Sequence, residues 1–265
     1  MHPLITLLTD FGLRDGYVGV MKGVIYRIAP TVQIADITHA ITPQNVMEGS
    51  LILSRSYRYF PPGSIHLAVV DPGVGTHRRP LAAQIGQHFF ICPDNGLLTP
   101  VLAEAEKAGL PIHLVHLDQP RFWLPQISTV FHGRDIFAPV AAHLAAGTPL
   151  KDLGSPLTDP RRLELPRPQP ILGGWQGQVM IVDRFGNLST NLERALFGEH
   201  QPKQVAIAGR VINGLVSTFG DRPAGELVAL FGTENELIVS VVNGSAAAET
   251  GARVGDTVTV TLGAP

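Results

Sequence analysis

The chain contains a single cysteine, Cys92, among its 265 residues. One thiol excludes an internal disulfide, and it also excludes a metal site built from several cysteines. A chain without disulfides suits a reducing compartment, and we therefore expect a cytoplasmic protein.

An excess of positive charge is also lacking. The formal net charge is -2 at pH 7 and the sequence pI is about 6.5. Binding to a phosphate backbone or to an anionic membrane surface depends on an excess of basic residues. We therefore expect neither nucleic acid nor a membrane as a partner.

Long hydrophobic runs are missing as well. The first one, which begins at Ile5, is broken by Thr9 and Asp10, and no basic region precedes it. This pattern is typical of a first strand and not of a signal peptide. No run approaches the roughly 20 residues that a membrane-spanning helix needs, so the sequence gives no support for export or membrane insertion.

Apolar residues make up 45% of the chain, enough to build the core of one large or two ordinary domains. Residues 1–155 alternate between strand-like and helical periodicity, which predicts an α/β domain. The expected strands are 5–11, 33–38, 65–71 and 112–117, and the expected helices are 15–30, 42–60 and 95–109. Residues 81–94 resemble a hairpin, so we expect a mostly parallel but mixed sheet. Thr42 is the expected N-cap of the second helix, with Pro43 at its first helical position.

A proline-rich segment follows this domain. Six prolines lie between Gly147 and Gly173, a density that suits a stiff extended connector. We place a linker at residues 156–172. Residues 173–265 contain short strand-like runs separated by Gly, Asn and Asp turns, with no clear helix, and predict a small all-β barrel or compact sandwich.

Polar clusters follow several of the predicted strands. They are TDFGLRDGYVG (9–19), VVDPGVGTHRRP (69–80), FHGRD (131–135) and DRFGN (183–187). Ligands of open α/β sheets bind beyond the carboxyl ends of the strands, and Asp10 and Asp71 are placed in this way. The alternatives are an N-cap or turn carboxylate for Asp10, and a turn with solvated charges around Asp71.

These motifs, together with a late NGSAA and in this order along the whole chain, resemble the S-adenosylmethionine (SAM) hydroxide adenosyltransferases, or SAM hydrolases. Fluorinases and chlorinases are their relatives. The resemblance implies that water or hydroxide attacks the 5′ carbon of SAM and yields adenosine and L-methionine. It implies no metal and no cofactor, since SAM is the substrate. It also implies a homotrimer whose sites lie between neighbouring subunits.

The resemblance assigns the catalytic roles to Asp71, Arg78 and His132, around the attacking water. We expect the DPGVG turn to hold Asp71 and Arg78 on opposite sides of a small polar pocket, with Arg79 as the rival for the arginine role. The halogenases carry an aromatic residue at the position of Asp71 and a small hydroxyl residue at that of Gly133. A carboxylate repels a halide ion, so this difference favours hydrolysis.

The resemblance also implies substrate contacts. Asp10 would bind the ribose hydroxyls, and Asp15 and Asp183 would lie near the methionine ammonium group. Residues of the β domain would bind adenine: Asn187, the NGSAA backbone around Asn243 and Ser245, and Phe219. Phe219 is either a stacking residue or a core aromatic.

Two other functions remain open. A metal-dependent hydrolase could use His66, Asp71, His77, His132 and Asp135 as ligands, although no tightly spaced ligand pair occurs and Arg78 would place a cation beside the metal. Metal analysis and an EDTA challenge would distinguish it. A non-catalytic SAM or adenosine binding module would bind the nucleoside without turnover.

Overall fold

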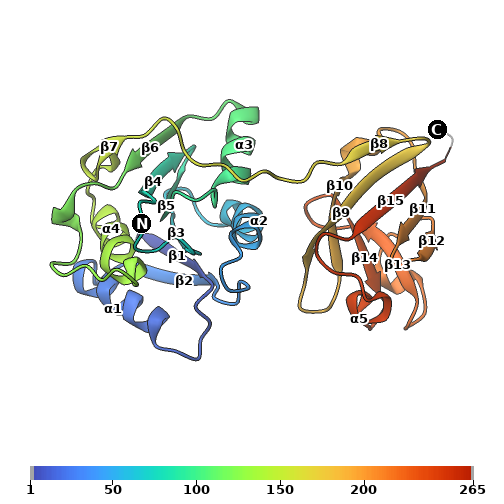
Figure 1. Ribbon diagram of the computed structural model, residues 1–265, viewed down its shortest axis with the longest axis horizontal. Coiled ribbons are helices and arrows are strands. Elements are labelled where there is room, and N and C mark those ends of the chain that lie inside the picture. The colour runs from blue at the N-terminus through green and yellow to red at the C-terminus, as the bar shows by residue number, and fades with distance from the viewer. Residues whose placement is uncertain (1–2, 264–265) are drawn as a thin grey trace. The chain divides into compact units, whose positions relative to one another are not determined.

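The computed structural model describes residues 3–263, and the chain divides into two compact units, residues 1–163 and 164–265 (Figure 1). Each unit has a hydrophobic core of its own. No helix among the described residues is long and apolar enough to cross a membrane.

The first unit is built on a seven-stranded sheet in the order β2-β1-β3-β5-β4-β6-β7. Its strands are β1 (Leu4–Thr9), β2 (Gln33–Thr38), β3 (Ile65–Val69), β4 (Pro80–Ile85), β5 (His88–Pro93), β6 (Ile112–His116) and β7 (Ser155–Pro156). β2, β1, β3 and β5 are parallel, whereas β4 pairs antiparallel with both β5 and β6. The predicted mixed sheet is therefore confirmed, with the β4–β5 hairpin at the expected place.

Helices cover both faces of this sheet. α1 (Tyr17–Ile28) packs with α4 (Ala138–Ala145) over one core, and α2 (Val46–Ser56) packs with α3 (Thr99–Ala108) over the other. Figure 1 shows the two pairs on opposite sides of the strands. Short helical turns complete the unit: η1 (Tyr57–Tyr59), η2 (Pro120–Phe122), the π-helical η3 (Gly133–Phe137) and η4 (Leu150–Asp152).

The predicted start of α2 at Thr42 is wrong. Gln44 has a φ of 65°, which interrupts a helix, and the helix begins only after Asn45. The Asn45 side chain accepts a hydrogen bond from the Glu48 backbone N–H at 3.0 Å. The Glu48 carboxylate in turn accepts one from the backbone N–H of Thr42 at 3.1 Å. Asn45 is thus the N-cap, and Thr42 belongs to the preceding turn.

The second unit is an antiparallel sheet in the order β12-β11-β15-β9-β10-β14-β13, with β8 paired to β9. Its elements are β8 (Gln169–Ile171), β9 (Gly174–Val182), β10 (Leu188–Glu193), η5 (Arg194–Phe197), β11 (Pro202–Ile207), β12 (Arg210–Asn213), η6 (Phe219–Asp221), β13 (Leu227–Phe231), β14 (Glu236–Val241), α5 (Ala246–Thr250) and β15 (Thr257–Leu262). The end strands β12 and β13 contact each other, so the sheet nearly closes into the expected barrel. The short helix α5 was not expected.

The proline-rich segment is fastened to the first unit up to Leu163. The backbone N–H of Arg161 donates to Asp94 at 2.7 Å, and that of Leu163 donates to the Thr99 hydroxyl at 2.8 Å. Arg162 forms an ion pair with Glu106 at 2.5 Å. This part of the segment follows the surface of the α/β unit and is not a free spacer.

A buried histidine lies in the first half of β3. His66 is fully buried, and its Nδ1 lies 2.8 Å from the Thr6 hydroxyl. Its Nε2 lies 3.2 Å from Nδ1 of His88, and Tyr57 packs edge-on against both rings. Desolvation, reinforced by His88, lowers the pKa of His66 to about 3. His66 is therefore neutral in the folded protein at all but strongly acidic pH.

This histidine makes the stability of the first unit depend on pH. Unfolded His66 titrates near pH 6.5, so its stabilising effect is complete above that pH and is lost as the pH falls toward 3. Between pH 6.5 and 4.5 we expect the wild type to lose about 2 kcal/mol more of unfolding free energy than His66→Gln. Urea unfolding at both pH values measures the difference, and equal losses in the two proteins would contradict a buried neutral His66.

Candidate active site

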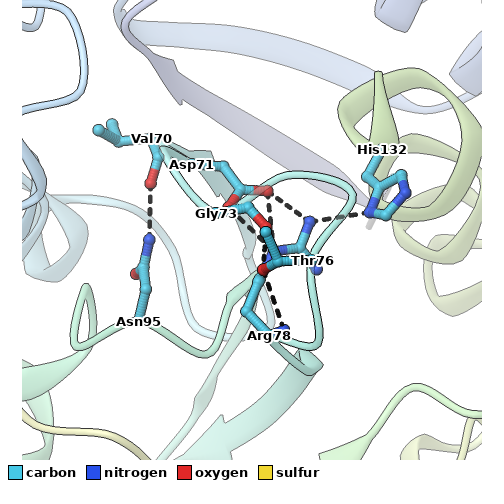
Figure 2. A network of polar contacts seen from close by, with 7 residues as sticks. All are labelled: Val70, Asp71, Gly73, Thr76, Arg78, Asn95 and His132. Atoms are coloured by element: carbon cyan, nitrogen blue, oxygen red, sulfur yellow. Dashed lines mark hydrogen bonds and ion pairs between the residues drawn. The ribbon is translucent and has the colours of Figure 1, made fainter. Parts of the chain in front are cut away.

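Asp71 stands at the carboxyl end of β3, where the chain leaves the sheet through the DPGVG turn (Figure 2). The carbonyl of the preceding residue, Val70, accepts a hydrogen bond from Asn95 at 2.8 Å, which anchors the strand end. Gly75 has a φ of 75°, and a Cβ there would lie 2.1 Å from the Thr129 carbonyl oxygen. Only glycine allows this turn to approach the loop around Thr129 so closely.

The turn brings Arg78 back onto Asp71. Nε of Arg78 lies 2.9 Å from each carboxylate oxygen of Asp71, and Nη2 contacts Oδ2. Nη2 also lies 3.0 Å from Nδ1 of His132. The Arg78 and Asp71 side chains are only 6% and 5% exposed. Figure 2 shows the guanidinium between the carboxylate and the imidazole.

Two expectations about the arginines can be compared with this geometry. Arg78 and Asp71 were expected on opposite sides of a pocket, and that expectation is wrong, because the two side chains are in direct contact. The rival, Arg79, lies elsewhere: its guanidinium binds Asp94 at 2.7 Å and Asp159 at 2.8 Å. Of the two arginines, Arg78 is the one next to Asp71 and His132.

The hydrogen bonds of His132 define its protonation. An arginine can only donate, so the Nδ1 atom that faces Arg78 carries no proton. A neutral imidazole carries one ring proton, which therefore lies on Nε2. Desolvation and the neighbouring Arg78 charge lower the pKa of His132 below its usual value, against a smaller opposing effect of Asp71 and Asp135. The imidazole is therefore neutral at neutral pH.

A cavity of about 440 Å³ opens beside Asp71 and His132. This volume falls within the range of small-molecule sites. Phe11, Tyr17 and Phe131 line it with an aromatic wall, in which Tyr17 and Phe131 meet edge to face with ring centres 5.2 Å apart. Arg78 is not among the described residues that line the cavity. It contacts Asp71 and His132, which do line it.

Gly133 lines the same cavity directly after His132. A Cβ at this position would lie 3.3 Å from Phe131 and 3.4 Å from Phe11. A larger residue would therefore press on the aromatic wall.

The two acidic residues of the first motif lie outside the lining of the cavity. Asp10 is half-buried, and its Oδ2 accepts the backbone N–H of Gln44 at 2.7 Å, which ties the end of β1 to the loop before α2. Asp10 is not the N-cap of α1, because that position belongs to Gly16. Asp15 is exposed just before α1.

Two of the candidates in the second unit, Asp183 and Ser245, line a shallow pocket of about 570 Å³. Both oxygens of Asp183 bind Asn187, one through its backbone N–H at 2.9 Å and one through its side-chain amide at 2.7 Å. Ser245 caps α5 by accepting the backbone N–H of Ala248 at 3.1 Å. Asp183, Asn187 and Ser245 thus lie in one region.

The remaining substrate-binding candidates in the second unit are Asn243 and Phe219. Asn243 has a φ of 54° in the turn before α5, and Asn243 and Gly244 at the start of the NGSAA stretch are exposed. Phe219 begins η6 and is 44% exposed, so it is not a core aromatic of this unit.

The residues considered as ligands for a metal-dependent hydrolase do not form a metal site. Within residues 3–263, no group of three or more His, Cys, Asp or Glu side chains is arranged to hold a metal ion. His66 binds Thr6 and His88, Asp135 binds Arg134, and Asp71 binds Arg78.

Comparison with known proteins shows which family the chain belongs to. A family model described as the SAM hydroxide adenosyltransferase N-terminal domain matches residues 5–154, and the model of the corresponding C-terminal domain matches residues 177–259. The chain belongs to the SAM hydroxide adenosyltransferase family. The resemblance seen in the motifs is confirmed.

Curated relatives and solved structures extend over the whole chain. A protein named (R)-S-adenosyl-L-methionine hydrolase from Salinispora tropica is 40% identical, covering 98% of both chains, and one from Thermus thermophilus is 40% identical, covering 96% of this chain and 98% of its own. A fluorinase from an Actinoplanes species is 31% identical over 73% of this chain and 72% of its own. The crystal structure of an uncharacterized conserved protein from Thermotoga maritima is 36% identical with a TM-score of 0.88, covering 97% of this chain and 99% of its own.

Sequence reasoning missed several residues that surround the candidate site. Asn95 and Ser128 were not singled out, and Asp135 was considered only as a metal ligand. Their roles depend on hydrogen bonds between distant segments, for which the sequence carries no spacing signal. Of these three residues, only Asn95 carries a signal in the sequence, because it lies in a PDNG turn and such a turn marks the end of a strand.

Proposed function

We propose that this protein hydrolyses SAM to adenosine and L-methionine by attack of water on the 5′ carbon. The observation that carries the proposal is the Asp71 carboxylate, which faces the cavity while Arg78 holds it from behind. Membership of the family and the hydrolase names of the similar proteins support the same reaction. The proposal needs no metal and no cofactor.

The reaction places simple demands on the protein. The water oxygen bonds to the 5′ carbon, the carbon–sulfur bond breaks, and its electron pair neutralises the sulfonium. Methionine leaves as a neutral thioether, so the leaving group needs no proton. The protein has to position the water in line and accept one proton from it.

Asp71 is the proton acceptor in this proposal. A carboxylate has about four lone-pair positions, and the contacts from Arg78 leave room for one more donor. His132 has no free lone pair, because Nδ1 faces Arg78 and the other nitrogen of the neutral ring carries the proton. His132 therefore orients Arg78 and the cavity wall and does not act as the base.

The same carboxylate favours water over a halide. A halide ion beside Asp71 would meet a negative charge that only Arg78 compensates, whereas water can donate to the carboxylate. Gly133 also provides no hydroxyl to the cavity.

The roles of Asp71 and His132 predict different outcomes when each side chain is replaced by an amide. We expect Asp71→Asn to lower kcat for adenosine formation by at least about 100-fold, because an amide cannot take the proton. We expect His132→Asn to stay within about 10-fold of the wild type, because its amide oxygen can still accept from Arg78. Chromatography of adenosine after incubation with SAM measures both.

His132→Ala serves as the control, since it removes the acceptor that faces Arg78 and should lower kcat by about 100-fold. If His132→Asn is as inactive as Asp71→Asn, His132 is the base. SAM binding without adenosine from the wild-type protein would favour the non-catalytic binding module.

The substrate contacts follow from the family resemblance. We propose that Asp10 binds the ribose hydroxyls and that Asp15 and Asp183 lie near the methionine ammonium group. Adenine would be bound by residues of the second unit, namely Asn187, Phe219, Asn243 and Ser245. The exposure of Phe219 and the open NGSAA turn support this role.

We also propose that the active form is a homotrimer whose sites combine the first unit of one subunit with the second unit of its neighbour. Nucleophile residues lie in one unit and the adenine-binding candidates in the other, which supports a shared site. Closed cyclic symmetry would give three equivalent sites.

Subunit mixing tests this arrangement. We expect His132→Ala and an inactive Asn187 variant to recover part of the wild-type activity when their subunits exchange, because some interfaces then pair two intact units. Each variant alone is the control. Exchange demonstrated by mass spectrometry without any recovery would place the whole site within one chain.

A further inference from the structure

Asp135 is a fully buried carboxylate that the proposed reaction does not use. Burial of a charge is costly unless partners compensate it. Arg134 provides two contacts, from Nε at 2.5 Å and from Nη2 at 3.0 Å, and its own side chain is 36% exposed. The third contact comes from the loop, where the backbone N–H of Ser128 donates to Oδ2 at 2.8 Å.

Ser128 connects this carboxylate to the cavity wall. It lines the cavity together with His132. Its hydroxyl accepts the backbone N–H of Val130 at 3.2 Å, which tightens the turn between Ser128 and His132. The loop is held at a second point, where the backbone N–H of Leu124 donates to the Asp135 carbonyl at 2.9 Å.

Asp135 and His132 also share the start of one helical element. His132 is the N-cap of η3, and the backbone N–H of Asp135 returns to the carbonyl of Phe131 at 3.2 Å. Asp135 therefore fastens both segments that flank His132: the η3 backbone that carries the ring and the loop that contains Ser128.

We propose that Asp135 is a positioning residue that fastens the Ser128 loop to the start of η3 and so holds the bare Nδ1 of His132 against Arg78. The inference rests on the proposed function, because it explains how the Arg78–His132 contact is maintained during turnover. A ring flipped by 180° would present Cδ2–H to Arg78, and a ring protonated on Nδ1 would present an N–H, so neither could accept from the guanidinium. Arg78 would then lose its partner on that side.

Two substitutions separate the hydrogen bond from the charge. Asp135→Asn keeps an oxygen that can accept from Ser128, and we expect kcat to stay within about threefold of the wild type. Asp135→Ala removes the acceptor, and we expect kcat to fall by about 10-fold or more while KM for SAM changes less than about threefold.

A double-mutant cycle distinguishes positioning from general stability. In a His132→Ala background, Asp135→Ala should lower kcat by less than about twofold, because the ring it positions is gone. Asp94→Ala is the matched control. Asp94 is also buried, paired with an arginine, and bound by a backbone N–H. Its partners are the Arg79 guanidinium and the Arg161 backbone, so it has no contact with the Ser128 loop. Its effect on kcat should be the same in both backgrounds.

Nitrogen NMR of labelled histidine gives a second measurement that needs no alanine variant. In the wild type we expect the His132 signals of a neutral ring protonated on Nε2, and the same tautomer in Asp135→Asn. Protonation on Nδ1, or equal effects of Asp135→Ala with and without His132, would overturn the inference. Failure of the wild type to form adenosine would contradict the proposed function instead, so the two failures are distinguishable.

Discussion

The guanidinium of Arg78 donates to Asp71 on one side and to His132 on the other, and the arrangement of the candidate site depends on this pair of contacts. The arginine neutralises a carboxylate that is 5% exposed, and it prevents His132 from binding a proton on the nitrogen that it faces. A permanent cation can fulfil both roles at any physiological pH. A lysine could not reproduce the forked contacts.

The fold supplies this geometry from three separate segments. β3 delivers Asp71 at the carboxyl edge of the parallel strands, where open α/β sheets place their ligands. The glycine turn returns Arg78 to the same point, and it can do so only because Gly75 lets it touch the Thr129 carbonyl. The loop before η3 adds His132, Ser128 and the aromatic Phe131. Rigid strands and short loops thus hold the polar groups before any substrate binds, which is the condition for efficient positioning.

Particular residues explain what the sequence could predict. Alternating periodicity was sufficient for the mixed sheet and the β barrel, and the family resemblance of the motifs pointed to Asp71, Arg78 and His132, which the fold brings into contact. The start of α2 was mistaken because Thr42–Pro43 and Asn45–Glu48 are both N-terminal signatures, and only the positive φ of Gln44 decides between them. Arg78 and Arg79 were indistinguishable by type, since adjacent side chains on an extended backbone point in opposite directions and the sequence does not say which one faces Asp71. The Ser128–Asp135 contact was beyond prediction, because it depends on the path of a loop.

Oxygen labelling tests the central claim, attack of water on the 5′ carbon, most directly. Purified protein would be incubated with SAM in water enriched in oxygen-18, and the products analysed by mass spectrometry. The account predicts adenosine with one heavy oxygen in its 5′ hydroxyl group and unlabelled methionine. Adenosine without the label, or cleavage of SAM at a different bond, would contradict it.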